Sequence, residues 1–176
     1  TPIQSGCIPF LMDYQDVVAK APTGTGKTYA FGIPIVEHTD PEGTDVTSLI
    51  LAPTRELALQ IRDDLRELSA LKKGVRVVCL YGGQPIDKQV NQLKKKPQIV
   101  VATPGRLMDH KKRRTIRLDK VQTVVLDEAD RMLDMGFIDD VTKILDMMPN
   151  RKNLGLFSAT ISREVMDISW VYQRDP

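Results

Sequence analysis

The sequence predicts an α/β fold of three layers, in which helices cover both faces of a mostly parallel central sheet. Short β-branched runs alternate along the chain with longer amphipathic stretches, which is the order expected for a doubly wound fold. Several of these runs are apolar at nearly every position, as in Ile99-Val100-Val101 and Val124-Val125-Leu126. Strands of that kind suit a parallel sheet that is buried on both faces.

Six short runs are the expected strands. In chain order they are Asp16–Lys20, Ser48–Ala52, Val75–Leu80, Gln98–Ala102, Val121–Leu126 and Asn153–Phe157. Each is rich in β-branched or other apolar residues, and a polar or helical segment follows each one.

The expected helices follow these strands. They are Lys27–His38, Arg55–Ala70, Gln84–Lys95, Pro104–Asp109, Phe137–Met147 and Ser162–Tyr172. In the second of them, Leu57, Ile61, Leu65 and Leu68 recur at spacings of three and four, which indicates one buried stripe.

The bulk composition narrows the class of protein. A chain of 176 residues fits one domain. No apolar run approaches the roughly 18–20 residues of a membrane span, and no signal peptide opens the chain, so no membrane partner is expected. Cys7 and Cys79 are too few and too far apart for a disulfide framework or a zinc site, and we expect a cytoplasmic location. The net charge is only +2, so a nucleic-acid partner would have to be held by local features.

The segment APTGTGKT, which begins at Ala21, is nearly the phosphate-binding loop G-x-x-x-x-G-K-[ST]. It follows an expected strand and opens an expected helix, which is the context that such a loop requires. Gly24 and Gly26 permit positive φ angles and close approach to phosphate oxygens. Lys27 can reach the β- and γ-phosphates, and the Thr28 hydroxyl can ligate Mg²⁺. A plain glycine-rich turn with a solvated lysine is the alternative.

A pair of acids follows a later buried strand. In VQTVVLDEAD the apolar run ends at Leu126, and Asp127 and Glu128 come directly after it. A carboxylate at that strand tip is placed to hold Mg²⁺ through water, and the adjacent glutamate can polarise an attacking water. An acid-rich helix N-terminus is the alternative, but it does not explain why the acids coexist with a phosphate loop. The pairing indicates hydrolysis of a nucleoside triphosphate.

Taken together, the motifs resemble those of the DEAD-box RNA helicases. They occur in the family's order: TPIQ (1–4), APTGTGKT (21–28), PTRELALQ (53–60), GG (82–83), TPGR (103–106), DEAD (127–130), RMLDMGF (131–137) and SAT (158–160). Alanine at the first position of the phosphate loop is the family's own form. The resemblance spans essentially the whole chain, and it implies a RecA-like P-loop domain that uses ATP and Mg²⁺ and binds RNA.

The resemblance also implies a domain organisation. The family has two RecA-like domains, and residues 1–176 resemble only the first, the N-terminal ATP-binding domain, truncated at its N-terminus. The arginine-bearing motifs of the second domain and the aromatic residue upstream of the TPIQ motif are missing. Both ends therefore look like cuts through a longer protein, and the expected partners are RNA and a second domain of the same chain. The chain is expected to be a monomer.

The resemblance assigns roles around ATP. The expected nucleotide contacts are Gln4, Ala21, Thr23, Gly24, Thr25, Gly26, Lys27 and Thr28. Thr28 and Asp127 are expected to bind the metal. Lys27, Asp127 and Glu128 are expected to be the catalytic residues. The amide of Gln4 can accept from adenine N6 and donate to N7, a pairing that guanine does not offer. An ordinary exposed glutamine is the alternative.

A second group of residues is expected to bind RNA. Thr54 and Thr103 are placed to cap helices, with Pro104 at the first helical position of the second one. Helix N-termini with an arginine beside them bind phosphates, and the resemblance implies that these phosphates belong to single-stranded RNA, read without regard to sequence. The expected set is Pro53, Thr54, Arg55, Gly82, Gly83, Thr103, Pro104, Gly105 and Arg106. Two plain helix caps are the alternative.

Three further features complete the expectations. Asp130 lies one helical turn from Asp127 and is placed to accept hydrogen bonds from Ser158 and Thr160, a link that couples the ATP site to RNA in the family; a helix cap is the alternative. The basic runs Lys94–Lys96 and Lys111–Arg114 are expected to be solvated loops rather than RNA contacts. Phe157 and Trp170 are expected in the core.

The competing functions use the same motifs. A translocase that acts on DNA is one alternative, and an ATP-regulated RNA clamp whose task is binding rather than unwinding is another.

Overall fold

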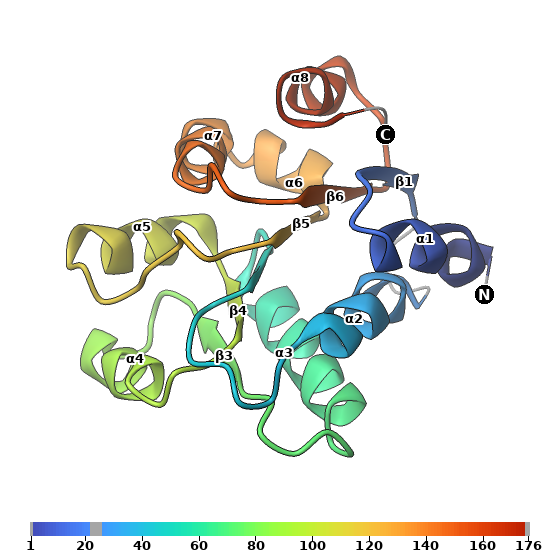
Figure 1. Cartoon of the computed structure of the whole chain (residues 1–176). Helices are drawn as coiled ribbons and strands as arrows, with labels where there is room; N and C mark the ends of the chain where they lie inside the picture. The colour runs from blue at the N-terminus through green and yellow to red at the C-terminus, as the bar shows by residue number, and fades with distance from the viewer. Residues whose placement is uncertain (1, 22–25, 175–176) are drawn as a thin grey trace.

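The structure, a computed structural model, describes residues 2–21 and 26–174 (Figure 1). Its strands are β1 (Val17–Lys20), β2 (Ser48–Leu51), β3 (Val77–Leu80), β4 (Ile99–Ala102), β5 (Thr123–Asp127) and β6 (Asn153–Ser158). They form one sheet in the order β1-β6-β5-β2-β4-β3. Every described pairing is parallel, where a mostly parallel sheet was expected.

Helices cover both faces of this sheet, so the predicted three-layer α/β fold is confirmed. The helices are α1 (Pro2–Met12), α2 (Lys27–His38), α3 (Arg55–Leu68), α4 (Ile86–Leu93), α5 (Pro104–Lys112), α6 (Ala129–Asp134), α7 (Ile138–Asp146) and α8 (Arg163–Tyr172). The first three pack on one face and the other five on the opposite face (Figure 1). Among the described helices, none combines the length and the apolar character that a membrane crossing requires.

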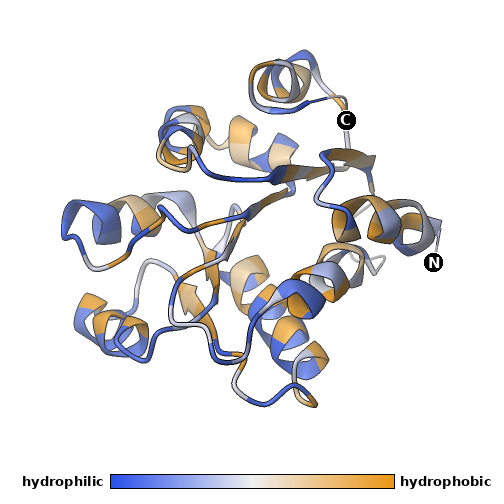
Figure 2. Cartoon of the chain, in the orientation of Figure 1, coloured by the Kyte–Doolittle hydropathy of each residue, from blue (hydrophilic) through white to orange (hydrophobic). Residues whose placement is uncertain are grey.

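The strands are apolar at successive positions because they serve two cores. Leu49 and Leu51 pack in the core under α4–α8, while Ile50 between them packs in the core under α1–α3. In the same way, Val124 packs in the core under α4–α8 and Val125 in the core under α1–α3. Figure 2 shows orange along several of the strands, whereas the helices carry both orange and blue segments.

Two helices were not expected, and one aromatic residue lies elsewhere than predicted. The helix α1 contains Pro9, and α6 is only six residues long. Phe157 is fully buried as predicted, but the prediction for Trp170 was wrong: it is 87% exposed at the end of α8, because Ile168 and Ser169 form the inward side of that helix.

The topology decides where the functional residues meet. The carboxyl ends of parallel strands share one edge of the sheet, and ligands of such folds bind at that edge. Since β1, β6 and β5 are neighbours, Ala21 after β1, the acids at the end of β5 and Ser158 at the end of β6 come together there. The residues that follow β2, β4 and β3 lie along the other half of the same edge.

Candidate nucleotide and RNA site

A buried charged cluster occupies the β1–β6–β5 half of the edge. The Nζ of Lys27 lies 3.1 Å from Oδ1 of Asp127 and 3.4 Å from Oε2 of Glu128. All three residues are buried. Lys27 opens α2 directly after Gly26, whose φ of 71° is the left-handed geometry that glycine adopts without strain. The structure therefore joins the predicted phosphate-loop lysine to both predicted acids.

Asp127 has one carboxylate oxygen without a partner. Its Oδ1 accepts a hydrogen bond from the Glu128 N–H at 3.0 Å and faces Lys27, whereas the buried Oδ2 has no hydrogen-bond partner among the described residues. Burial raises the pKa of Asp127 to about 6, and Lys27 opposes that rise. An unsatisfied buried carboxylate oxygen is costly unless a cation or water meets it.

This oxygen fits the predicted magnesium site. The described part of the chain holds no group of three or more His, Cys, Asp or Glu residues suited to a metal. Mg²⁺ does not need such a group, because it keeps several waters and is commonly held by one or two carboxylates together with substrate phosphates. Thr28, in the first turn of α2, is half-buried beside Lys27.

Glu128 occupies a strained turn. It has a φ of 51° and a ψ of 52°, a left-handed conformation that costs a residue with a side chain roughly 1–2 kcal/mol. The turn separates β5 from α6, and the carboxylate lies between Lys27 and Arg131, whose Nη1 is 3.6 Å away. A conformation of this cost persists where the surrounding structure fixes it.

The predicted adenine contact lies next to the phosphate loop. The Nε2 of Gln4 donates to the carbonyl oxygen of Gly26 at 3.3 Å, so α1 is tied to the end of the loop. Ala21, at the start of the loop, is buried, and its N–H donates to the carbonyl of Ser158 at 2.8 Å. The predicted contacts Thr23, Gly24 and Thr25 lie outside the described residues.

The three residues predicted to couple the sites are in contact. Both the hydroxyl and the N–H of Thr160 donate to Oδ2 of Asp130, at 3.0 and 3.2 Å. Ser158 behaves differently from the expectation: its hydroxyl donates to the Thr160 carbonyl at 2.7 Å and accepts from the Asp130 N–H at 3.2 Å. Partial burial opposes ionisation of Asp130, but the hydrogen bonds outweigh it and lower the pKa.

The predicted RNA residues lie along the β2–β4–β3 half of the edge. Pro53 and Thr54 follow β2, Gly82 and Gly83 lie in the turn after β3, and Thr103, Pro104 and Gly105 follow β4. Thr54 caps α3 as expected, accepting from the Leu57 N–H at 3.3 Å. Arg55 is exposed, and a Cβ at Gly83 would lie 3.4 Å from its Nη1, so the structure brings α3 and the glycine pair together.

The start of α5 differs from the expectation in two ways. Thr103 stands at the N-cap position and Pro104 begins the helix, as predicted, but the Thr103 side chain makes no capping hydrogen bond. Arg106 is largely covered, and its Nη1 donates to the Gln84 carbonyl at 2.9 Å and to Oε1 of Gln89 at 3.3 Å. It therefore ties α5 to the segment after β3.

Sequence reasoning missed the buried polar residues behind Arg106. His110 is fully buried, with Nε2 2.8 Å from Oε1 of Gln89 and Nδ1 2.7 Å from Oγ1 of Thr115. Burial, followed by the nearby positive charge of Arg106, lowers the pKa of His110. Gln89 also donates to the carbonyl of Tyr81 at 2.8 Å. No sequence pattern distinguishes such residues from solvated ones on a helix.

Comparison with known proteins places these features in a wider group. A family model described as DEAD/DEAH box helicase matches residues 1–168. The DEAD-box ATP-dependent RNA helicase CshA of Bacillus subtilis (strain 168) is 49% identical over 176 residues, which are 100% of this chain and 35% of that protein. The chain thus spans about a third of the length of that curated relative.

Two solved structures are similar throughout the chain. A DEAD box protein from the hyperthermophile Methanococcus jannaschii superposes with a TM-score of 0.93 and 44% identity, covering 99% of this chain and 48% of that one. The yeast DEAD-box splicing factor Prp28 gives a TM-score of 0.94 and 34% identity, covering 100% of this chain and 44% of that one.

Proposed function

The chain belongs to the DEAD/DEAH box helicase family, and on that basis we propose that it is the ATP-binding, N-terminal RecA-like domain of an ATP-dependent RNA helicase. In the whole protein, ATP binding and hydrolysis would drive local unwinding of RNA duplexes or remodelling of RNA–protein complexes. The observation that carries the proposal is the buried cluster of Lys27, Asp127 and Glu128 beside the phosphate loop.

The residues of the cluster have distinct proposed roles. Thr28 and Oδ2 of Asp127, which has no hydrogen-bond partner among the described residues, would hold Mg²⁺, and the metal would neutralise charge on the phosphates. Lys27 exchanges its contact with the acids for the β- and γ-phosphates of ATP. Glu128 orients the attacking water and accepts its proton. Gln4, already beside the loop at Gly26, reads the adenine.

RNA is proposed to bind along the other half of the edge. The capped N-terminus of α3, the exposed Arg55 and the glycine pair offer backbone N–H groups and one cation to successive phosphates. The residues at the start of α5 extend that track, and Arg106 holds its two sides together. Asp130, Ser158 and Thr160 link the nucleotide half to the last strand and are proposed to couple the two halves.

A second RecA-like domain is proposed to complete both sites. The chain covers only 35% of its relative from Bacillus subtilis, so the rest of that relative is long enough to contain a second domain. Cys7 and Cys79 are buried free thiols, which suits a reducing compartment such as the cytoplasm.

Calorimetry on the chain tests the nucleotide site. We expect Mg²⁺–ADP to bind more tightly than Mg²⁺–GDP, because one mismatched bidentate contact costs roughly 1–3 kcal/mol. Lys27→Ala should abolish binding, while Lys143→Ala, at an exposed lysine on α7, should leave it unchanged. Equal affinities for the two nucleotides would remove the role of Gln4, and unaltered binding by Lys27→Ala would overturn the proposed site.

A strand-displacement assay on the protein that joins this chain to its second domain tests the activity. ATP-dependent separation of a short RNA duplex is expected. Binding of RNA that depends on ATP without any displacement would instead identify an RNA clamp.

A further inference from the structure

One part of the molecule carries far more positive charge than the rest. Between Lys88 and Lys120 there are eleven Lys and Arg residues and two Asp, a net charge of +9, whereas the whole chain carries +2. The remainder of the chain is therefore acidic overall. The strongly basic stretch includes both basic runs that the nucleotide and RNA sites leave unused.

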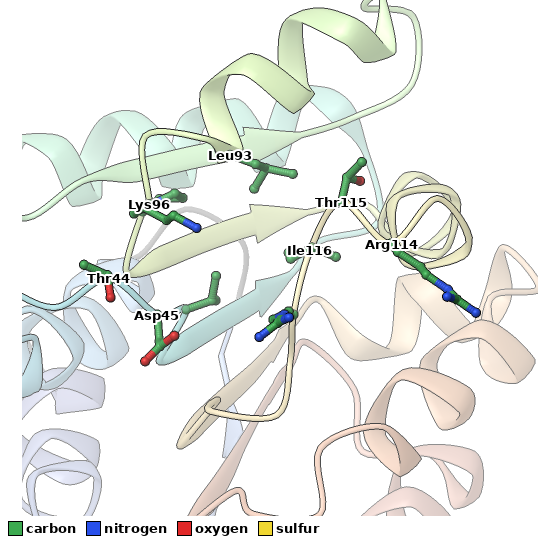
Figure 3. A pocket seen from close by; sticks show the side chains of 10 residues that line it. Thr44, Asp45, Leu93, Lys96, Arg114, Thr115 and Ile116 are labelled. Carbon is green, nitrogen blue, oxygen red and sulfur yellow. The ribbon is translucent and has the colours of Figure 1, made fainter.

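The structure brings the two runs together around a pocket of about 390 Å³. The pocket lies between the end of α4, the segment after α5 and the segment that leads into β2, and its lining includes Asp45, Lys96, Arg114 and Arg117. Figure 3 shows Lys96 and Asp45 at one end and Arg114 at the other. Asp45 and Lys96 precede β2 and β4, so this pocket is separate from the track at the carboxyl ends of those strands.

The cations of this pocket are not used inside the protein. Within residues 2–21 and 26–174, the side chains of Lys96, Arg114 and Arg117 make no ion pair and no hydrogen bond, and all three are exposed. Lys96 and Arg114 have φ angles of 59° and 57°, the left-handed region that glycine and asparagine favour after a helix. Compensation of the helix dipoles accounts for Lys94 at the C-cap of α4 and for a cation in the last turn of α5, but not for two runs and Arg117 together.

A second, smaller cavity lies between this pocket and the proposed RNA track along α5. This cavity of about 370 Å³ between α4 and α5 is lined by Arg106, Asp109, Lys112 and Arg113. Arg106 belongs to the track, and Arg113 is the neighbour of Arg114 in the first pocket. Basic side chains therefore extend from the start of α5 along the helix to Lys96.

We propose that this basic surface, made of the two cavities and defined by Lys96, Lys112, Arg113, Arg114 and Arg117, binds the phosphate backbone of RNA that extends beyond the track. The inference rests on the proposed function, which supplies RNA as the polyanion. None of the described residues that line the two cavities is aromatic, so bases have no stacking platform and the contact is to phosphates without sequence preference. A polyanion would also relieve the repulsion among cations that have no carboxylate partners.

The test compares two variants with the same loss of charge. Lys96→Gln/Arg117→Gln removes two cations of the basic surface, and Lys143→Gln/Arg163→Gln removes two exposed cations on α7 and α8. Binding of a short oligouridylate of about 6 nucleotides, which covers only the track, and of a longer one of about 25 nucleotides is measured by fluorescence anisotropy across a series of KCl concentrations. Thermal unfolding of each variant verifies that it is folded.

The expected result is selective. The basic-surface variant should bind the longer RNA roughly tenfold more weakly, and its dependence of log K on log salt should be shallower by about 1.4, since each lost phosphate contact removes about 0.7 for single strands. Its affinity for the short RNA should equal that of the parent, and the control variant should match the parent on both.

Each other result decides between the two proposals. Equal binding of the longer RNA by the two variants would overturn the basic surface and leave the track intact. Selective loss on the longer RNA without any binding of the short RNA would support the basic surface and remove the track. Competition by polyglutamate as effective as that by RNA of equal charge would assign the surface to an acidic protein and overturn the RNA proposal.

Discussion

At the scale of single residues, the site contains two buried carboxylates that share one ammonium group. Asp127 and Glu128 face Lys27, and a third contact comes from the exposed Arg131. Buried ion pairs gain little net stability, because desolvation offsets the attraction between the charges. The arrangement is therefore better explained by the chemistry that we propose for it than by stability.

The roles of the two carboxylates can be separated by mutation. In a protein that joins this chain to the proposed second domain, Glu128→Gln should retain Mg²⁺–ATP binding, because Asp127 keeps its oxygens. It should lose about 10²–10⁴-fold in turnover, the usual contribution of a general base. Calorimetry and a steady-state ATPase assay measure the two effects. Glu164→Gln, on the exposed start of α8, is the control. Hydrolysis by Glu128→Gln at the parent rate would show that another group activates the water.

His110 should make the stability depend on pH. Its pKa in the folded protein lies below the ordinary value of about 6.5, so between these two values the unfolded chain binds a proton that the folded chain does not. The stabilisation from neutral His110 is complete above about pH 6.5 and is lost as the pH falls toward the lower, folded value.

Urea unfolding of the parent and of His110→Asn at several pH values checks this effect. On acidification, the difference in free energy of unfolding between the parent and the variant should shrink. His38, the other histidine of the sequence, is kept in both proteins. A difference in free energy of unfolding that stays constant from about pH 7.5 to 5 would contradict the assignment.

At the scale of elements, the helices show which sequence signals were sufficient. The start of α3 was predicted because Thr54 caps it and a leucine stripe follows, and α2 was predicted at both ends. The helix α6 is only six residues long, too short to display a period of 3.6 residues, so no periodic pattern predicted it. The helix α1 contains Gly6 and Pro9, and it is held by Cys7 and Leu11, which pack in the core under α1–α3. Tertiary contacts of this kind leave no local signal.

The same limit applies to the candidate site. Lys27 and Asp127 could be placed together because the strand–loop pattern fixes their edge of the sheet. The hydrogen bonds from Arg106 to Gln84 and Gln89 could not be predicted, because they depend on how closely α4 and α5 pack. Thr103 occupies the predicted capping position without making the bond, since side-chain orientation is decided by surroundings that spacing does not reveal.

The two threonines give a matched test of capping. Thr54→Ala should cost about 1 kcal/mol of stability, because it leaves the Leu57 N–H at the start of α3 without its acceptor. Thr103→Ala should cost clearly less, since no capping bond is lost at α5. Urea unfolding measures both differences. Equal costs would mean that the side chain of Thr103 caps α5 in solution.

At the scale of the whole molecule, the nucleotide and RNA candidates divide one sheet edge between them. The arginines of the RNA half, Arg55 and Arg106, follow β2 and β4, and Arg131 is paired with Glu128. These three arginines, all among the described residues, therefore lie on the RNA half of the edge or are already paired. An arginine finger contributes roughly 10³–10⁵ to the rate of phosphoryl transfer, and we propose that the second domain provides it.

The chain alone should therefore bind adenine nucleotide but hydrolyse ATP very slowly. The measurement is a steady-state ATPase assay with and without single-stranded RNA, beside the protein that contains both domains. RNA should barely stimulate the isolated chain. Comparable stimulated rates would show that the finger lies within residues 1–176, and loss of that activity in Arg131→Ala would identify it.

The strand order affects how the domain folds while the ribosome is synthesising it. The strand β1, which leads into the phosphate loop, has β6 as its only neighbour among the described strands, and the Asp16 side chain bonds to the N–H of Leu154, 138 positions away. At a synthesis rate of about 5–20 residues per second, a ribosome needs roughly 7–30 s to make the missing partner. During that interval β2, β4 and β3 can pair, but β1 cannot join the sheet. We therefore expect the candidate nucleotide site to assemble late, and a nascent chain to bind ATP only when nearly all of the domain has been translated.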